Sequence, residues 1–164
     1  MAREGAAARR PRGRLNEDFL DLLRSLLKEE ARFLVVGAYA MAAHGVPRAT
    51  GDIDIWVDAD RQNAARVFTA LARFGAPLES LGISIQDFAR ADSVIQIGLP
   101  PRRIDLLTGI SGVTFEKAWA GRLSLLLFGL QVPVLGRADL IANKRAAGRP
   151  KDLADLAILD PEKK

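Results

Sequence analysis

Residues 32 to 58 place a strand, a glycine break, a short helix and a second strand in close succession, which limits the folds open to the chain. Arg32 to Gly37 is an apolar run ending in glycine, which predicts a buried strand followed by a turn. Ala38 to His44 is rich in alanine and is followed by glycine and proline, so we expect a short helix there. Gly51 to Asp58 alternates polar and apolar residues, which predicts a second strand.

The other segments also show helical or strand periodicity, with glycine or proline at many boundaries. Helical spacing covers 16–30, 61–74, 114–120, 137–147 and 150–159. Strand patterns cover 93–98, 103–107, 123–128 and 130–135. We expect the last two to form a hairpin across Gly129, and the apolar run Leu123 to Leu130 to be buried. Residues 78–90 are ambiguous, and only 85–89 favours a short helix.

This order of elements predicts an α/β (α+β) fold, in which a small mixed β-sheet is flanked by helices and the chain closes with two helices. At 164 residues, with 49% hydrophobic and 27% charged residues, the chain has the composition of a globular protein with one core. We therefore expect a single domain over residues 15–164.

The net charge of +4 comes from the first 14 residues, where five arginines stand against Glu4. The rest of the chain has equal numbers of positive and negative side chains, so its net charge does not indicate a binding partner. We interpret residues 1–14 as a disordered basic tail, with contact to nucleic acid or an anionic surface as the weaker alternative.

Several functional classes are disfavoured by residues that the chain lacks. It has no cysteine, which removes disulfides, thiolate catalysis and cysteine-bound zinc, and a single histidine disfavours a histidine-based metal site. No apolar run approaches the roughly 20 residues of a membrane span, and the start does not resemble a signal peptide. We expect a cytoplasmic protein that does not bind a membrane.

Two aspartates, Asp52 and Asp54, begin the second strand. Side chains alternate along a strand, so both project from one side, about 7 Å apart, while Ile53 and Ile55 point into the core. Carboxylates so placed repel each other unless a cation lies between them, and their oxygens suit Mg²⁺ or Mn²⁺. An aspartate pair that only caps a turn is the alternative. The apolar residues that follow and the strand–glycine–helix unit before the pair favour a metal site for phosphoryl transfer.

A third carboxylate, Asp105, lies in the middle of an apolar strand pattern, where an isolated charge is costly to bury. If this strand lies beside the first, Asp105 completes a site of three carboxylates. A solvated Asp105 facing a turn is the alternative, and the residues alone favour neither.

The run from Phe33 to Asp58 resembles the DNA polymerase β-like nucleotidyltransferase superfamily: a glycine turn, a short helix, an Asp-x-Asp strand and a third aspartate on a later strand. Among its members, the chain is similar to minimal nucleotidyltransferases and to the enzyme component of AbiE-type toxin–antitoxin pairs. The segments from Arg48 to Ile55 and from Lys144 to Asp155 carry this likeness.

The resemblance implies roles for individual residues. Asp52, Asp54 and Asp105 would be the catalytic metal ligands, with Asp105 assisting the attacking hydroxyl. The nucleotide would contact the backbone of Gly37 and Ala38. Many members have glycine or serine at the position of Ala38, so a serine contact is absent here. Further nucleotide contacts would come from Arg48, Thr50 and Lys144, each balanced by a purely structural role.

For other residues near these motifs a structural role is favoured. His44 ends the short helix, Trp56 suits sheet packing, and Arg145 suits a solvated position. Lys151 and Asp152 suit a surface ion pair.

The resemblance implies an enzyme that transfers a nucleoside monophosphate from an NTP to a hydroxyl with Mg²⁺ or Mn²⁺ as cofactor. The acceptor stays open between RNA such as tRNA, a protein and a small molecule, and an antitoxin is a possible partner. A non-catalytic nucleotide-binding or interaction module with the same fold is the main alternative, and a metal-dependent phosphodiesterase is a third.

Overall fold

The computed structural model describes residues 15–99 and 102–161. The predicted tail, residues 1–14, lies outside the described residues. The first helix is α2 (Leu15–Lys28), followed by β1 (Phe33–Val36), α3 (Gly37–Ala43), β2 (Ile53–Val57) and α4 (Arg61–Phe74). The sequence therefore predicted this half of the fold to within a few residues.

The second half contains more short elements. After α5 (Ile85–Ala89), which lies in the ambiguous segment, come β3 (Val94–Ile97), β4 (Ile104–Leu107) and α6 (Phe115–Ala120). The hairpin of β5 (Leu123–Leu127) and β6 (Leu130–Val134) precedes α7 (Arg137–Ala147) and α8 (Pro150–Leu159). Phe128 and Gly129 both have positive φ, as a two-residue hairpin turn requires.

The six strands form one mixed sheet in the order β3-β4-β2-β1-β6-β5. The central strand β2 is antiparallel to β1 and parallel to β4, and β1 is parallel to β6. This confirms the predicted mixed sheet flanked by helices. The order also places the β2 and β4 aspartates on neighbouring strands.

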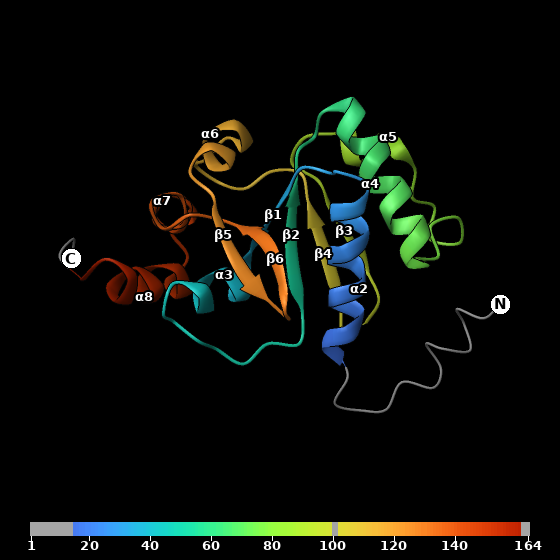
Figure 1. Ribbon diagram of the computed structural model, residues 1–164. Coiled ribbons are helices and arrows are strands. Elements are labelled where there is room, and N and C mark those ends of the chain that lie inside the picture. The colour runs from blue at the N-terminus through green and yellow to red at the C-terminus, as the bar shows by residue number, and fades with distance from the viewer. Residues whose placement is uncertain (1–14, 100–101, 162–164) are drawn as a thin grey trace.

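The two faces of the sheet are covered by different helices. Helices α2 and α4 pack on each other to one side of the sheet, and α3, α7 and α8 lie to the other (Figure 1). Ile53 and Ile55 are fully buried, as strand alternation predicts for the residues that face away from the aspartates. The core is therefore continuous on the α2–α4 side, and the polar residues of β2 face the other side.

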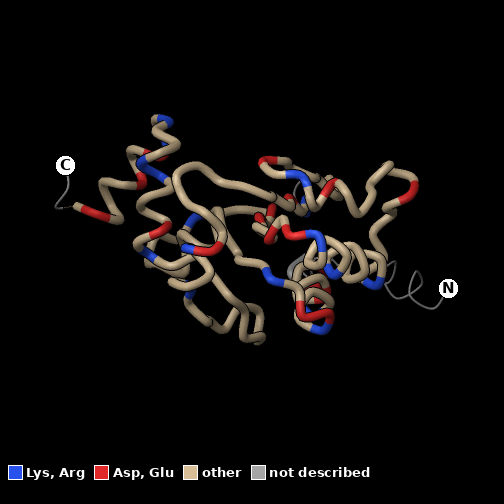
Figure 2. Tube along the Cα trace, turned by 90° about the horizontal axis from the view of Figure 1, so that it is seen from above, with Lys and Arg blue, Asp and Glu red and all other residues tan. Residues whose placement is uncertain are grey.

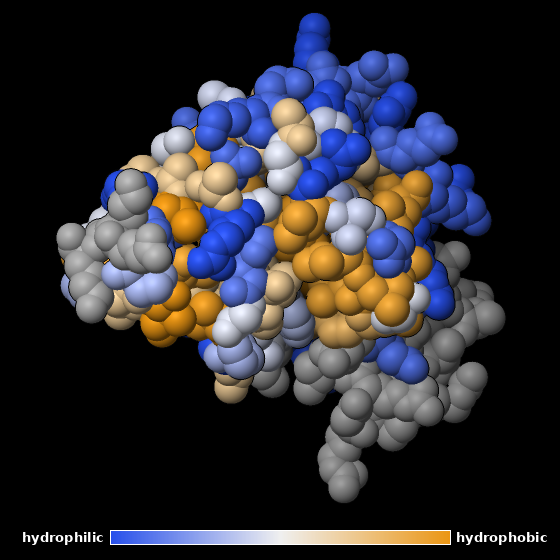
Figure 3. Space-filling model, turned by 60° about the vertical axis from the view of Figure 1, so that its left-hand side comes forward, coloured by the Kyte–Doolittle hydropathy of each residue, from blue (hydrophilic) through white to orange (hydrophobic). Residues whose placement is uncertain are grey.

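The prediction that Leu123 to Leu130 is buried was wrong, because every residue of this run is at least partly exposed. Strand β5 is at the edge of the sheet, with Leu126 70% exposed and Leu123 also exposed. Apolar surface is visible from this side of the molecule in Figure 3. An edge strand has a neighbour on one side only, so its side chains are less covered than those of a central strand.

No helix within residues 15–99 and 102–161 is long and apolar enough to cross a membrane.

Candidate active site

The three aspartates lie together because two strands that are distant in sequence are neighbours in the sheet. Asp54 of β2 lies directly opposite Asp105 of β4 in the parallel pair. Asp52 precedes the first residue of β2, so the expectation that both aspartates lie inside the strand was wrong by one position. Asp52, Asp54 and Asp105, called here the acidic cluster, all line one cavity.

An arginine that the sequence analysis did not single out is bound to this cluster. The Arg103 guanidinium donates two hydrogen bonds to Asp105, from Nε to Oδ1 at 2.8 Å and from Nη2 to Oδ2 at 3.2 Å. Its Nη2 is also 3.4 Å from Oδ2 of Asp52, and its backbone N–H donates to Oδ1 of Asp52 at 3.3 Å. Arg103 therefore links two of the three carboxylates.

Asp54 has the least favourable electrostatic environment of the three. The pKa of Asp54 is raised to about 6, first by burial and then by the charge of Asp105, a hydrogen bond with Asp105 and the charge of Asp52. Arg103 opposes this shift without cancelling it. The pKa of nearby Tyr39 is also raised, by burial and then by the charge of Asp52. The acidic cluster thus retains excess negative charge.

Gly37 makes room for the cluster. Its φ is +68°, a conformation that favours glycine, and a Cβ built there would collide with the carboxylate of Asp54. Gly37 begins α3, where no side chain caps the helix start. Gly37 and Ala38, the predicted nucleotide contacts, both line the cavity.

The cavity has a volume of about 770 Å³ and is bordered by both halves of the chain. One side carries the acidic cluster, Arg103 and the start of α3. The rest of the lining comes from α7, the start of α8 and the α3–β2 loop, and includes Arg48, Thr50, Lys144, Arg149 and Lys151. Viewed from above, acidic positions gather near the middle of the trace, with basic positions around them (Figure 2).

A second charged group occupies the helical side of the cavity. Lys144 is 91% buried, and its Nζ lies 3.0 Å from Asp155 Oδ2 and 3.4 Å from Asp152 Oδ1. Arg48 forms an ion pair with Asp155, and Arg149 Nε lies 2.6 Å from Asp152 Oδ2. We call Arg48, Lys144, Arg149, Asp152 and Asp155 the ion-pair cluster.

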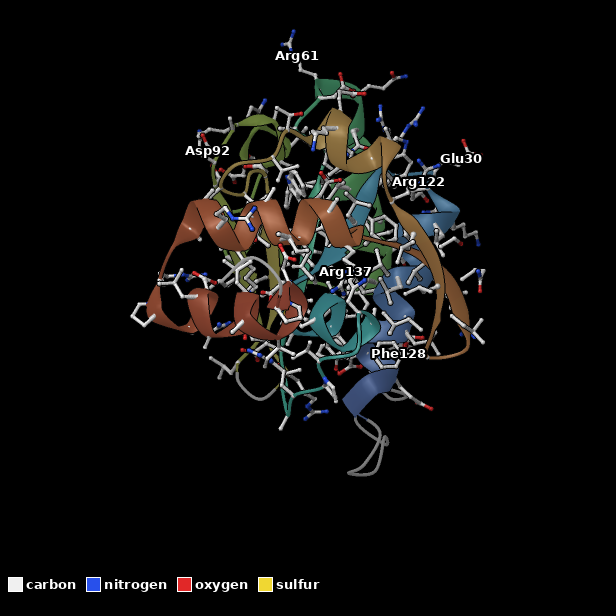
Figure 4. The ribbon with its side chains drawn as sticks, turned by 90° about the vertical axis from the view of Figure 1, so that its left-hand side faces the viewer. Glu30, Arg61, Asp92, Arg122, Phe128 and Arg137 are labelled. Atoms are coloured by element: carbon white, nitrogen blue, oxygen red, sulfur yellow. The ribbon has the colours of Figure 1, made fainter. Side chains whose placement is uncertain are left out.

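The ion-pair cluster corrects one prediction. Asp152 is fully buried and bound to Lys144 and Arg149, so it is not part of a surface pair with Lys151. Helices α7 and α8 are held by a further contact, in which Arg137 donates to the Leu159 carbonyl; Figure 4 shows Arg137 between these helices.

The remaining predicted residues have identifiable structural contacts. The Thr50 hydroxyl hydrogen-bonds with the backbone of Asp52 and so shapes the turn before β2. Nε2 of His44 lies 2.8 Å from the Leu135 carbonyl oxygen, which is a packing contact. Trp56 is 1% exposed and meets the Phe115 ring edge-on at 5.1 Å, which confirms the packing role.

The sequence contained a usable signal for the contact of Arg103 with Asp105, and a weaker signal for the ion-pair cluster. Arg103 lies in the predicted strand 103–107, two positions before Asp105, so alternation predicts that they share a face, as Asp52 and Asp54 were expected to do. Asp152 and Asp155 are three apart on a helix and share a face, but only the packing of α7 on α8 reveals Lys144 as their partner.

The carboxylate oxygens of the acidic cluster are suitable ligands for a divalent cation. Their present arrangement, however, is not suited to binding one. Its ligands are carboxylate oxygens, which Mg²⁺ and Mn²⁺ prefer. Across the described residues, however, no three acidic or histidine side chains are arranged to hold a metal ion. Arg103 is bound to the oxygens of Asp105 and Asp52 that such an ion would need.

Comparison with known proteins gives a structural match. No protein-family profile and no curated protein matches the sequence. The fold is similar to the crystal structure of a putative nucleotidyltransferase (TM1012) from Thermotoga maritima, with a TM-score of 0.59. The match covers 94% of this chain and 97% of that one at 16% sequence identity. At this identity the likeness is one of fold, and the chain has a nucleotidyltransferase-like fold.

Proposed function

We propose that this protein is a metal-dependent nucleotidyltransferase that moves a nucleoside monophosphate from an NTP to an acceptor hydroxyl. The observation that carries this proposal is the cavity, whose lining combines three carboxylates with several cations. A nucleoside triphosphate bound with a divalent cation needs both, because the cation requires oxygen ligands and the phosphates require positive partners.

In this proposal Asp52, Asp54 and Asp105 would hold the divalent cation, which would neutralise phosphate charge. The residues around the start of α3 and on α7 and α8 position the triphosphate, with Gly37, Ala38, Arg48, Thr50, Lys144 and Lys151 lining its path. Lys151 is exposed and has no ion-pair partner among the described residues, so its charge is available to a phosphate.

The reaction forms one bond and breaks one. The acceptor hydroxyl oxygen attacks the α-phosphorus, the bond from that phosphorus to the bridging oxygen of pyrophosphate breaks, and the hydroxyl proton passes to a carboxylate of the acidic cluster. Holding the two reactants in line within one cavity supplies the orientation that such a displacement requires. Release of pyrophosphate distinguishes this transfer from hydrolysis by a phosphodiesterase.

The test is incubation of the protein with α-³²P-labelled NTPs, Mg²⁺ or Mn²⁺ and a cell extract, followed by separation of RNA, protein and small molecules. We expect label in one of these fractions, which identifies the acceptor class. Asp54→Asn should lower the rate by about 10²–10³-fold. The control is Asp58→Asn, at the far end of β2, where Asp58 is paired with Arg32 outside the cavity.

Failure of every labelled NTP to transfer, despite tight metal-dependent nucleotide binding, would favour the non-catalytic binding module instead. An antitoxin partner and a toxin role stay predictions from the sequence resemblance.

A further inference from the structure

Arg103 has an unusual position for a residue beside proposed metal ligands. Its guanidinium binds both oxygens of Asp105 and one oxygen of Asp52. Asp105 is 92% buried, so this contact replaces much of the water that its carboxylate would otherwise bind. A planar two-bond contact of this kind is among the stronger ion pairs in proteins.

The guanidinium and a divalent cation compete for the same oxygen atoms. A carboxylate whose two oxygens already accept hydrogen bonds from Arg103 has fewer lone pairs directed toward a cation, and the positive charge of Arg103 repels that cation.

A ligand bound in the cavity would also be within reach of Arg103. Its side chain is 29% exposed and lines the cavity wall. The guanidinium fork that fits a carboxylate fits a phosphate equally well. A bound triphosphate would therefore offer Arg103 a replacement for Asp105.

We propose that Arg103 is a displaceable counterion that binds the acidic cluster before the substrate arrives and couples metal binding to nucleotide binding. This inference rests on the proposed function. The metal binds poorly alone because it must displace Arg103, and the nucleotide favours the displacement by accepting the guanidinium. Each ligand then strengthens binding of the other by the same factor, as linkage requires. Arg103 is thus a positioning residue that couples the two binding events.

The first measurement is Mn²⁺ binding without nucleotide, followed by the electron paramagnetic resonance signal of free Mn²⁺. We expect Arg103→Gln to bind Mn²⁺ about tenfold more tightly than the native protein. This factor corresponds to the free energy of a partly exposed charge-assisted ion pair, which Mn²⁺ no longer has to break in the variant. Arg103→Lys keeps the charge without the fork, and should tighten binding less, by about threefold.

The matched control is Arg102→Gln. Arg102 is the preceding residue and carries the same charge, but its Nη1 lies 3.8 Å from Asp18 and it does not line the cavity. This variant should bind Mn²⁺ as the native protein does. Tightening as large as that of Arg103→Gln would mean a general field effect and would overturn the inference.

The second measurement is equilibrium dialysis of labelled α,β-methylene NTPs, in EDTA and in saturating Mn²⁺. The Mn²⁺-dependent gain in nucleotide affinity should be at least tenfold smaller in Arg103→Gln than in the native protein. An unchanged gain, or native-like Mn²⁺ affinity in Arg103→Gln, would overturn the role of Arg103 and leave the proposed function intact. A complete lack of Mn²⁺ binding by native protein and variants, with and without nucleotide, would overturn both.

Discussion

The acidic cluster and the ion-pair cluster both contribute residues to one cavity, but they differ in how their buried charges are balanced. The acidic cluster holds three carboxylates with one guanidinium, and the pKa of Asp54 is raised. In the ion-pair cluster two carboxylates meet three cations, and the pKa values of Asp152 and Asp155 are lowered. Burial opposes the lowering at Asp155, where the contacts with Lys144 and Arg48 outweigh it.

The two clusters differ in charge balance. The ion-pair cluster is satisfied by its own members and fastens α8 to α7 and to the α3–β2 loop. The acidic cluster has more carboxylates than cations, so its negative charge is not balanced by its own members. A buried carboxylate with a raised pKa, such as Asp54, is typical of sites that act on a ligand.

The largest expected effect on stability comes from breaking the ion-pair cluster. Lys144→Met removes the cation shared by Asp152 and Asp155 and leaves two buried carboxylates with one partner each. We expect the free energy of unfolding in urea to fall by about 2–3 kcal/mol. Arg145→Met is the control, because its pair with Asp160 is at the surface and should be worth under about 1 kcal/mol. Equal losses in the two variants would contradict the structural role of Lys144.

A smaller effect on stability, and in this case an increase, is expected from a substitution in the acidic cluster. The pKa of Asp54 is raised to about 6, so its ionised form is less stable in the folded chain than in the unfolded chain. The stability that this group contributes is present below about pH 4 and is lost as the pH rises through 6. Asp54→Asn should therefore raise the free energy of unfolding by about 1–2 kcal/mol at pH 7 in EDTA.

The measurement for Asp54 is urea unfolding of the native and variant proteins at several pH values between 4 and 7. The native protein should lose stability toward pH 7 more steeply than Asp54→Asn. Parallel profiles would show that the acidic cluster is not under electrostatic strain.

The smallest effect concerns acid unfolding. The hydrogen bond from Arg149, more than any other contact, lowers the pKa of Asp152 to about 2. A lowered pKa contributes stability above about pH 4 that is lost as the pH falls toward 2. Asp152→Asn should weaken this acid dependence by under about 1 kcal/mol, because Arg149 is largely exposed to water. Urea unfolding between pH 2 and 5 checks this, and an unaltered acid slope would contradict it.

The sequence predicted local structure well where local rules decide it. Helix α4 begins after its Asp60 cap and ends at Gly75 in a left-handed conformation, and both signals are visible in the sequence. The hairpin across Gly129 is equally local. Strand order is not local, which is why the exposure of Leu126 on the edge strand β5 was missed.

The candidate site also combines features that local sequence rules predict with features that depend on tertiary packing. Alternation placed Asp52 and Asp54 on one side, but the position of Asp105 depends on the pairing of β2 with β4, which sequence spacing does not contain. The partners of Lys144 depend on helix packing and were equally inaccessible. Arg103 was accessible in principle, since it shares a face of β4 with Asp105.

The close approach of Gly37 to Asp54 has a consequence for engineering the protein. Replacing a glycine by alanine is a common route to thermostability, because it reduces the freedom of the unfolded chain. At Gly37 that route is closed twice, by the positive φ and by the carboxylate that would meet the new methyl group. A search for more heat-resistant variants should leave this turn untouched.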